Sequence, residues 1–196
     1  MKKVILAILV LATFGAKAQE GYKKFKVDAS LGYAIPSGSG AKTGAIFTIE
    51  PKYAVLPNVS VGLRLESAIM ANSTTYTTNQ TSFDLSVKAM NSYVVTADYY
   101  LSDKRSFRPF VGGGLGLFRT AGIQINSNNS IDNTSYGNKF GGIIRGGFEA
   151  GHFRLGLEYN LVGKTNALAY NGSKVGETKN NYLGIKVGFC ISGGKK

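Results

Sequence analysis

From about residue 25 onward, hydrophobic and polar residues alternate along the chain in eight separate stretches. A period of two is typical of a β-strand whose two faces meet different surroundings. In the first stretch, Phe25, Val27, Ala29, Leu31, Tyr33 and Ile35 form one face and Lys26, Asp28, Ser30, Gly32 and Ala34 form the other. The predicted strands are 25–35, 44–55, 59–69, 83–101, 109–118, 140–150, 153–163 and 181–191.

The charged residues of these strands all fall on the face opposite the apolar one. The acidic members are Asp28, Glu50, Glu66, Asp84, Asp98, Glu149 and Glu158, and the basic members are Lys26, Lys52, Arg64, Lys88, Arg145, Arg154 and Lys186. A soluble barrel would turn its apolar face inward. Balanced charges among Gly, Ser and Thr instead suit a small hydrated interior, while the other face suits lipid. The pattern predicts an all-β fold, an eight-stranded antiparallel transmembrane β-barrel of up-and-down type.

The predicted connections alternate between short and long. The short ones are 56–58, 102–108 and 151–152, and the longer ones, rich in Asn, Ser, Thr and Gly, are 36–43, 70–82, 119–139 and 164–180. Short periplasmic turns and long external loops are typical of outer-membrane barrels. Because the strand number is even, both termini are expected in the periplasm.

The N-terminus has the features of a secretory signal peptide. Lys2 and Lys3 precede an apolar run, and Ala16-Lys17-Ala18 forms a small-x-small cleavage site. The run is shorter than the ~20 residues of a spanning helix, so cleavage is favoured over a retained anchor. We expect a signal peptide at 1–18, a barrel domain at 19–196, and the outer membrane of a Gram-negative cell as destination.

Composition and charge fit this interpretation. Loss of Lys2, Lys3 and Lys17 with the signal peptide lowers the net charge from +12 to +9. The basic residues in excess of the balanced inward set are scattered near both barrel rims, which favours contact with anionic lipid head groups over nucleic acid. Two outward positions fit poorly: Asn91 is polar at an expected mid-membrane depth, and Pro51 cannot donate a ladder hydrogen bond, so we interpret it as marking a bulge.

Three segments carry a resemblance to a known family. They are Ala97-Asp98-Tyr99-Tyr100-Leu101, Arg108-Pro109-Phe110-Val111-Gly112-Gly113-Gly114-Leu115-Gly116 and Gly147-Phe148-Glu149-Ala150-Gly151, together with a Gly-Gly-Lys-Lys tail. The chain resembles the small outer-membrane β-barrel proteins of the Bacteroidota and, more distantly, OmpX-, OmpA- and OmpW-like barrels. The resemblance implies the fold and supplies no catalytic residues. Relatives in Proteobacteria end in an aromatic residue, whereas seven residues follow Phe189 here.

The candidate chemistry is sparse. His152, the only histidine, falls in a predicted periplasmic turn, and with a single cysteine a metal site would depend on carboxylates. The glycines at 112, 114 and 116 lack the spacing of a phosphate-binding loop, so we expect them to make room for bulky neighbours such as Phe110, Phe118 and Tyr100. We interpret Arg64, Glu66, Arg145, Glu149, Arg154 and Glu158 as a structural, salt-bridged network in a plugged interior. No cofactor or metal is expected.

These observations predict a non-enzymatic, monomeric outer-membrane barrel with a structural or surface-binding role. Its expected partners are outer-membrane lipid, the insertion machinery and an unidentified external partner of the long loops; nucleic acid is not one. The alternatives are OmpW-like transport of a small or apolar molecule, a lipid-modifying membrane enzyme, and a soluble ligand-binding barrel. A side opening and an apolar pocket near the outer rim would favour transport.

Overall fold

The computed structural model describes residues 22–37, 42–78, 80–102, 106–125, 131–168, 174–178, 180–191 and 194–195. The expected signal peptide lies outside these residues. The strands are β1 (Tyr22–Lys23), β2 (Phe25–Pro36), β3 (Gly44–Leu56), β4 (Val59–Thr78), β5 (Gln80–Tyr100), β6 (Arg108–Ile125), β7 (Ile131–Ala150), β8 (Phe153–Val162), β9 (Thr165–Leu168), β10 (Lys174–Thr178), β11 (Tyr182–Ile191) and β12 (Gly194–Lys195). Within the described part of the chain, no helix is long and apolar enough to cross a membrane.

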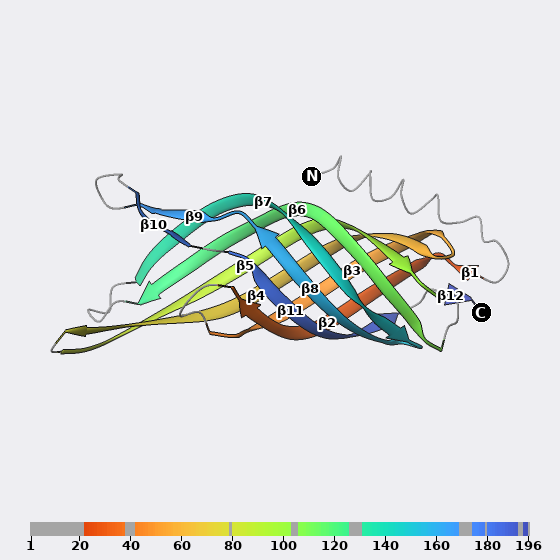
Figure 1. The fold of residues 1–196 in the computed structure, drawn as a ribbon, viewed down its shortest axis with the longest axis horizontal. Coiled ribbons are helices and arrows are strands. Elements are labelled where there is room, and N and C mark those ends of the chain that lie inside the picture. The colour runs from red at the N-terminus through yellow and green to blue at the C-terminus, as the bar shows by residue number, and fades with distance from the viewer. Residues whose placement is uncertain are drawn as a thin grey trace.

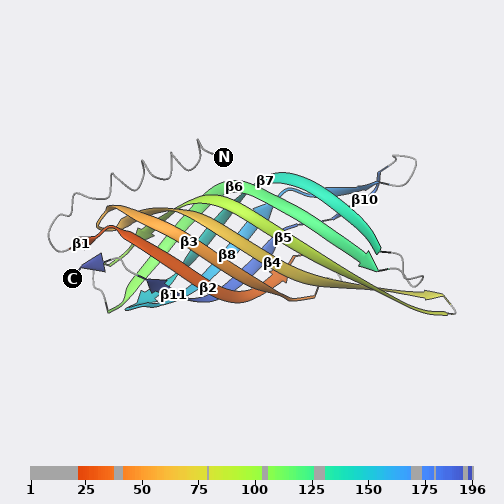
Figure 2. The same cartoon turned by 180° about the vertical axis from the view of Figure 1, so that it is seen from behind.

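Eight of the strands close into a barrel in the order β11-β2-β3-β4-β5-β6-β7-β8, and every neighbouring pair is antiparallel. Figures 1 and 2 show the tilted strands from two sides. Following register partners once around the barrel leads from Phe110 to Thr120 on β6, a stagger of ten residues. Stagger and tilt together close an eight-stranded sheet around an interior that side chains can fill. The predicted eight-stranded antiparallel barrel is confirmed.

The short connections match the prediction, and so does the long one at 36–43, which separates β2 from β3, but the other three long connections do not. The turn at 151–152 is as expected, but the segments 70–82 and 119–139, predicted as loops, belong largely to strands. β4 and β5 pair as far as Thr78↔Gln80, and β6 pairs with β7 as far as Ile125↔Ile131. Segment 164–180 contains the β9–β10 hairpin. Beyond the membrane both strand faces can meet water, so a hydrogen-bonded ladder continues there without the alternation on which the prediction depended.

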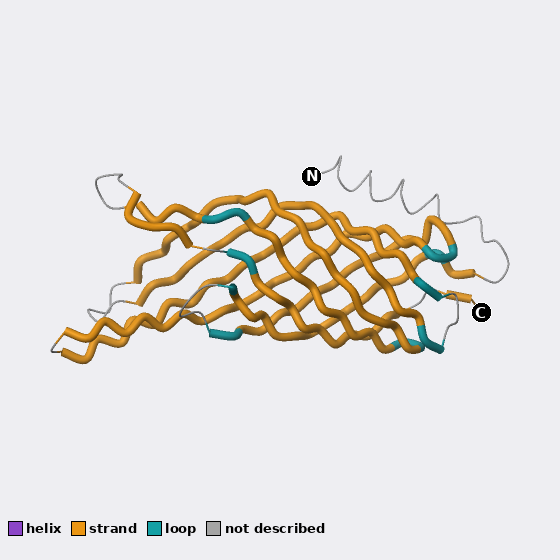
Figure 3. Tube along the Cα trace, viewed as in Figure 1, coloured by secondary structure: helices purple, strands orange, loops and turns teal. Residues whose placement is uncertain are grey.

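The extended hairpins project from one end of the barrel. Figure 3 shows the strands of β4–β5 continuing well past the barrel body, while the short turns lie at the opposite end. The short pair β1–β12 also lies at the short-turn end (Figure 1). The barrel therefore has two different ends, one with short turns and one with projecting sheet.

The two faces of the barrel wall differ as predicted. On β2, Leu31 is 65 % exposed on the outward face and Asp28 is 4 % exposed on the inward face. Outward side chains along the barrel strands are mainly large and apolar, including Val95, Leu115, Phe140 and Ile144. Such an apolar outer band is the surface that lipid requires. The side chains of Asp84 and Lys88 lie outside the described residues.

The inward glycines of β6 have a different role from the one expected. A Cβ at Gly116 would lie 2.1 Å from the carbonyl oxygen of Tyr93, and one at Gly112 would lie 2.2 Å from Oδ1 of Asp98. These glycines permit close approach of the neighbouring strand β5 rather than making room for Phe110, Phe118 and Tyr100. The ring of Phe118 is accommodated instead by Gly141 of β7, where a Cβ would lie 2.9 Å from Cε2 of that ring.

The structure accounts for the two unusual outward residues. The register shift between β3 and β4 lies between Ala54 and Leu56, so the interpretation of Pro51 as a bulge is wrong. Pairing of β3 with β4 passes from Ile49↔Leu65 to Lys52↔Gly62 without a change of register, which leaves Pro51 in a gap of the ladder. Asn91 is register partner to Ser67 and to Arg119, whose side chain is exposed, so it belongs to a polar row toward the hairpin end.

Candidate functional site

Among the side chains that the structure describes, the barrel interior contains twelve buried charged residues, six acidic and six basic, and we consider it first as the candidate site. They are Asp28, Glu50, Glu66, Asp98, Glu149 and Glu158 with Lys26, Lys52, Arg64, Arg145, Arg154 and Lys186. Each reaches the interior because inward and outward side chains alternate along its strand. Their formal charges sum to zero.

One cluster lies near the short-turn end. The Lys26 ammonium lies 2.5 Å from Oε1 of Glu149 and donates to the Tyr100 hydroxyl at 2.6 Å. Tyr100 in turn donates to Oε1 of Glu149 at 2.7 Å, and Arg154 also contacts this oxygen. The Arg154 guanidinium lies 3.6 Å from the centroid of the Phe110 ring and 3.0 Å from Oδ2 of Asp98. Cations and a phenol therefore surround the one carboxylate of Glu149.

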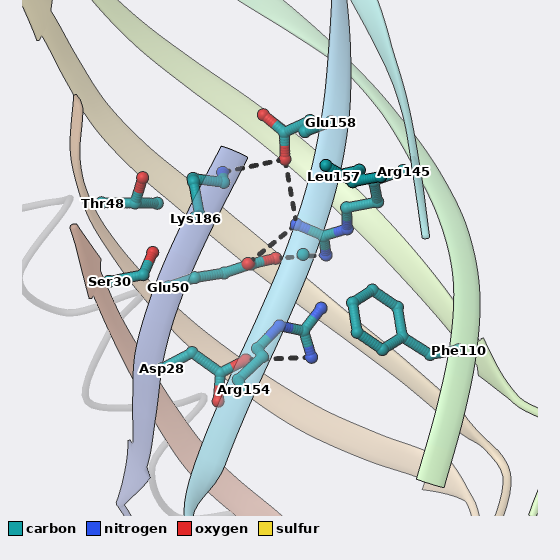
Figure 4. A pocket seen from close by; sticks show the side chains of 11 residues that line it. Asp28, Ser30, Thr48, Glu50, Phe110, Arg145, Arg154, Leu157, Glu158 and Lys186 are labelled. Carbon is teal, nitrogen blue, oxygen red and sulfur yellow. Dashed lines mark hydrogen bonds and ion pairs between the residues drawn. The ribbon is translucent and has the colours of Figure 1, made fainter. Parts of the chain in front are cut away.

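A second, central cluster lies between the other two, and Figure 4 shows its members Asp28, Glu50 and Arg145. Arg145 donates to both carboxylate oxygens of Glu50, at 2.7 and 2.9 Å, and to Oδ1 of Asp98 at 2.7 Å. The Lys52 ammonium lies 2.8 Å from Oδ2 of Asp98 and 2.6 Å from Oδ2 of Asp28. Such a bidentate arginine–carboxylate contact fixes geometry as well as charge. These contacts join strands β2, β3, β5 and β7 across the lumen.

A third cluster lies closer to the hairpin end. The Arg64 side chain is fully buried and contacts both Glu66, at 3.1 Å, and Glu158. The Lys186 ammonium lies 3.0 Å from each of the same two carboxylates. The Tyr182 hydroxyl donates to Oε1 of Glu66 at 2.6 Å. Arg145 connects this cluster to the central one through a 3.7 Å contact with Glu158.

Apolar side chains fill the interior above this third cluster. The layer consists of Ala34, Ile46, Ala68, Met70, Met90, Val94, Phe118, Ile143, Val162 and Tyr182. Ala34, Ala68, Val94 and Phe118 have no exposed surface. Alternation in the sequence already predicted an inward position for Ala34, Phe118 and Tyr182, which have the parity of the charged face, but it did not predict that such residues meet in one apolar layer. The lumen is therefore occupied by charges over most of its depth and by apolar side chains beneath the hairpins.

Little space remains among the described charges at the centre of the barrel. The cavity among Asp28, Glu50, Arg145, Arg154 and Lys186 has a volume of about 20 Å³. That volume is enough for about one water molecule. It does not hold a sugar, a nucleotide or another solute of that size.

The described residues include one group with the composition of a metal site. Ligand atoms of Asp28, Glu149 and Cys190 lie within 4.8 Å of one another. However, the Lys26 ammonium contacts Glu149 and lies 3.9 Å from Asp28, and Arg154 contacts Glu149 directly. These side-chain cations already occupy the position and supply the charge that a metal ion would bring, so the donor set does not fit a cation.

The structure brings together the six residues proposed from the sequence as a charge network. Arg145 is register partner to Glu158, and Glu149 is register partner to Arg154, across the β7–β8 hairpin. Arg64 and Glu66 are two residues apart on β4 and in contact. The same network also includes Lys26, Asp28, Glu50, Lys52, Asp98 and Lys186, which nothing in the sequence distinguished from the other inward charges.

His152 lies apart from the network, in the turn between β7 and β8. Its Nδ1 is 2.8 Å from the carbonyl oxygen of Cys190, and its ring stacks on Phe189 with centroids 5.3 Å apart. The preceding Gly151 has a φ of +62°, a conformation that favours glycine. The histidine therefore packs the turn against β11.

The comparisons with known proteins agree with this architecture. Residues 5–189 match the family described as outer membrane protein beta-barrel domain. Neisserial surface protein A is similar in structure, with a TM-score of 0.57 and 18% identity over 88% of this chain and 99% of that one. Ail of Yersinia pestis, solved with the heparin analogue sucrose octasulfate, has a TM-score of 0.50 and 11% identity over 86% and 99% of the two chains. OprG of Pseudomonas aeruginosa has a TM-score of 0.50 and 12% identity over 86% and 96%.

At these identities the solved structures establish a shared fold and nothing about ligands. No curated protein matches the sequence. The family match spans nearly the whole described barrel, and the observed closed sheet is the architecture that the family name describes. The chain belongs to the outer membrane protein beta-barrel domain family, whose members are integral to the outer membrane of the Gram-negative envelope.

Proposed function

We propose that the protein is a non-enzymatic barrel with a plugged lumen, whose role is structural or surface-binding. The observation that carries this proposal is the filled interior. Twelve paired charges of the described residues occupy it, an apolar layer closes it toward the hairpins, and the cavity among the central charges has a volume of about 20 Å³. A solute path would require several ion pairs to separate at once.

Planar-bilayer recording tests the plugged lumen. We expect the purified protein to show little or no steady conductance. A matched variant, Glu50→Ala with Arg145→Ala, removes the bidentate pair at the centre while keeping the interior neutral, and it should conduct more than the natural chain. A large, stable pore formed by the natural chain would contradict the proposal.

The surface role is supported by the projecting sheet. β4 and β5 extend as a paired ladder as far as Thr78↔Gln80, and β5 is paired with β6 as far as Leu85↔Ile125. The β9–β10 hairpin adds a second projection at the same end (Figure 1). We propose that this end is external, that both termini are periplasmic, and that the monomer presents the sheet to an external partner after insertion by the outer-membrane machinery.

Cysteine labelling in intact cells tests this orientation. The natural thiol is first removed by Cys190→Ser, which leaves no cysteine in the chain. Thr78→Cys then places a thiol at the tip of β4, and His152→Cys places one in the turn at the opposite end. A membrane-impermeant maleimide should label the Thr78→Cys protein and not the His152→Cys protein. The reverse pattern would place the termini outside the cell.

Transport of a small or apolar molecule is the second candidate. The observation in its favour is the gap in the β3–β4 ladder at Pro51, which is where a side opening would form. On the inner side of this gap, Glu50 is held by Arg145, and Arg64 is held by Glu66 and Glu158. These contacts favour a closed wall.

A lipid-modifying activity has less support. The single histidine packs the short-turn end, against Phe189 and the backbone of Cys190. The carboxylates of the interior are engaged by cations rather than poised beside a nucleophile. We also propose that the source is a member of the Bacteroidota, on the strength of the Gly-Gly-Lys-Lys tail and the strand-and-turn motifs.

A further inference from the structure

A row of polar residues interrupts the lipid-facing surface on one side of the barrel. Ser67 of β4, Asn91 of β5, Arg119 of β6 and Asn138 of β7 are successive register partners. Asn91, Arg119 and Asn138 are exposed, and the neighbours Met90, Ser92, Phe118 and Thr120 are buried, which shows that the row faces outward. Adjacent strands lie about 4.8 Å apart, so these side chains can contact one ligand together.

The charge of Arg119 is unusual in this position. Among the described side chains of the eight barrel strands, it is the one charged group on the outward face. Within the same described residues, no carboxylate lies within ion-pair distance of it. An arginine on the lipid face is costly at mid-depth and much less costly near the interface, where it can reach phosphate groups.

An outward groove of about 290 Å³ adjoins this row. Phe47 and Ile49 of β3 form one wall, Tyr93 of β5 forms the other, and Leu65 and Ser67 of β4 lie between them. The walls are apolar and exposed. Asn91 lines the groove as well and is the register partner of Arg119, so the polar row meets the groove at this residue.

We propose that this groove and row form a binding site for one anionic, phosphorylated lipid of the leaflet at the hairpin end. The Arg119 guanidinium binds the phosphate, because it offers several donors and a charge that no described carboxylate pairs. The amides of Asn91 and Asn138 add hydrogen bonds to the head group, and an acyl chain lies between Phe47 and Tyr93. Charge complementarity selects the lipid, since a neutral zwitterion would leave the guanidinium less well matched.

The absence of tryptophan from the sequence makes the site directly measurable. Phe47→Trp places a single fluorophore in the groove wall. Leu157→Trp is the matched control: it is outward and half-exposed on β8, which lies four strands from β4 in either direction around the barrel. Each variant is refolded into phosphatidylcholine vesicles that contain phosphatidylglycerol, with bromine on the acyl chains of one lipid or of the other.

We expect brominated phosphatidylglycerol to quench the Phe47→Trp variant more than its share of the bilayer predicts, with an apparent preference of about fivefold, as one cation near a charged surface supplies. The Leu157→Trp variant should show no such preference. Adding Arg119→Gln to Phe47→Trp should abolish the preference, so that quenching by brominated phosphatidylcholine rises to the value that its share of the bilayer predicts.

Two results would overturn the proposal. Equal preference at both tryptophans, or a preference that survives Arg119→Gln, would show that the site does not select the head group. Weak quenching of the Phe47→Trp variant by both brominated lipids would show that something other than lipid, such as a second copy of the chain, covers the groove.

Discussion

Breaking the bidentate contact between Arg145 and Glu50 should destabilise the barrel more than any surface change. Arg145→Met removes the cation that holds Glu50 at 2.7 and 2.9 Å and Asp98 at 2.7 Å. Of the described groups, Glu50 then keeps the Lys52 ammonium, at 3.4 Å, and the Thr96 hydroxyl, at 2.5 Å. Leaving a buried charge without its partner typically costs about 3–5 kcal/mol. Glu50→Gln should have a similar effect, because it leaves the interior with one excess positive charge.

The double variant separates the pair from the net charge. With both changes the interior is neutral again, and no charged partner is left behind. We therefore expect the double variant to be more stable than the sum of the two single losses by about 2–3 kcal/mol. Equilibrium unfolding in urea, measured in lipid vesicles by far-ultraviolet circular dichroism and by gel mobility of the folded form, gives the free energies of unfolding.

A second cycle supplies the control. Arg64→Met and Glu149→Gln also remove one positive and one negative charge, but Arg64 belongs to the cluster near the hairpins and Glu149 to the one near the short turns. Their losses should add to within about 0.5 kcal/mol. If the Arg145–Glu50 cycle also showed no coupling, or if both cycles coupled equally, net charge rather than contact would explain the effect and the network would not be built of specific pairs.

Three further perturbations test other parts of the structure by the same unfolding assay. Leu157→Arg, on the outward face, should lower the free energy of unfolding by about 2–4 kcal/mol, whereas Leu56→Arg at the short-turn end should lower it by about 0–1 kcal/mol. Equal losses would refute the assignment of the lipid face. Gly151→Ala should cost about 1–2 kcal/mol because its φ is +62°, although a Cβ there would meet no other atom. Gly116→Ala should cost more, because its Cβ would lie 2.1 Å from the Tyr93 carbonyl oxygen, and the opposite ranking would contradict the close approach of β5 and β6. His152→Ala removes a stacked ring and one hydrogen bond, so it should lower the free energy of unfolding by about 1 kcal/mol. The low conductance expected of the natural chain should not change, and a gain of conductance would indicate that the turn gates the lumen.

The barrel could be predicted because alternation is a local property. Along 25–35, alternate residues are apolar, and this pattern already shows which side chains face lipid. The charged side chains occupy the positions between them and therefore face the interior. The same local rule identified the turn at Gly151, and with it the pairing of Glu149 with Arg154 across the hairpin. These predictions needed no knowledge of distant strands.

The contacts across the lumen could not be predicted in this way. Arg145 meets Glu50 from β3 and Asp98 from β5, and the choice depends on how the closed barrel staggers its strands by ten residues. The hairpin extensions were missed because polar residues on both faces look like loop in a single sequence. Asn91 looked misplaced for a related reason: its depth in the membrane depends on the register that sets it beside Arg119.

An interior of paired charges also suits the route by which such a chain reaches its membrane. Buried ion pairs often contribute less stability than apolar side chains of similar size would, so the twelve charges are not explained by stability alone. Apolar residues in their place would make each strand hydrophobic on both faces and bring it closer to the composition of a spanning helix, which an inner membrane retains. With charges at alternate positions the mean hydropathy of the chain stays at −0.02. A continuous apolar surface then forms on the outside of the barrel, and it forms only when the strands have paired and the charged side chains have paired with one another inside.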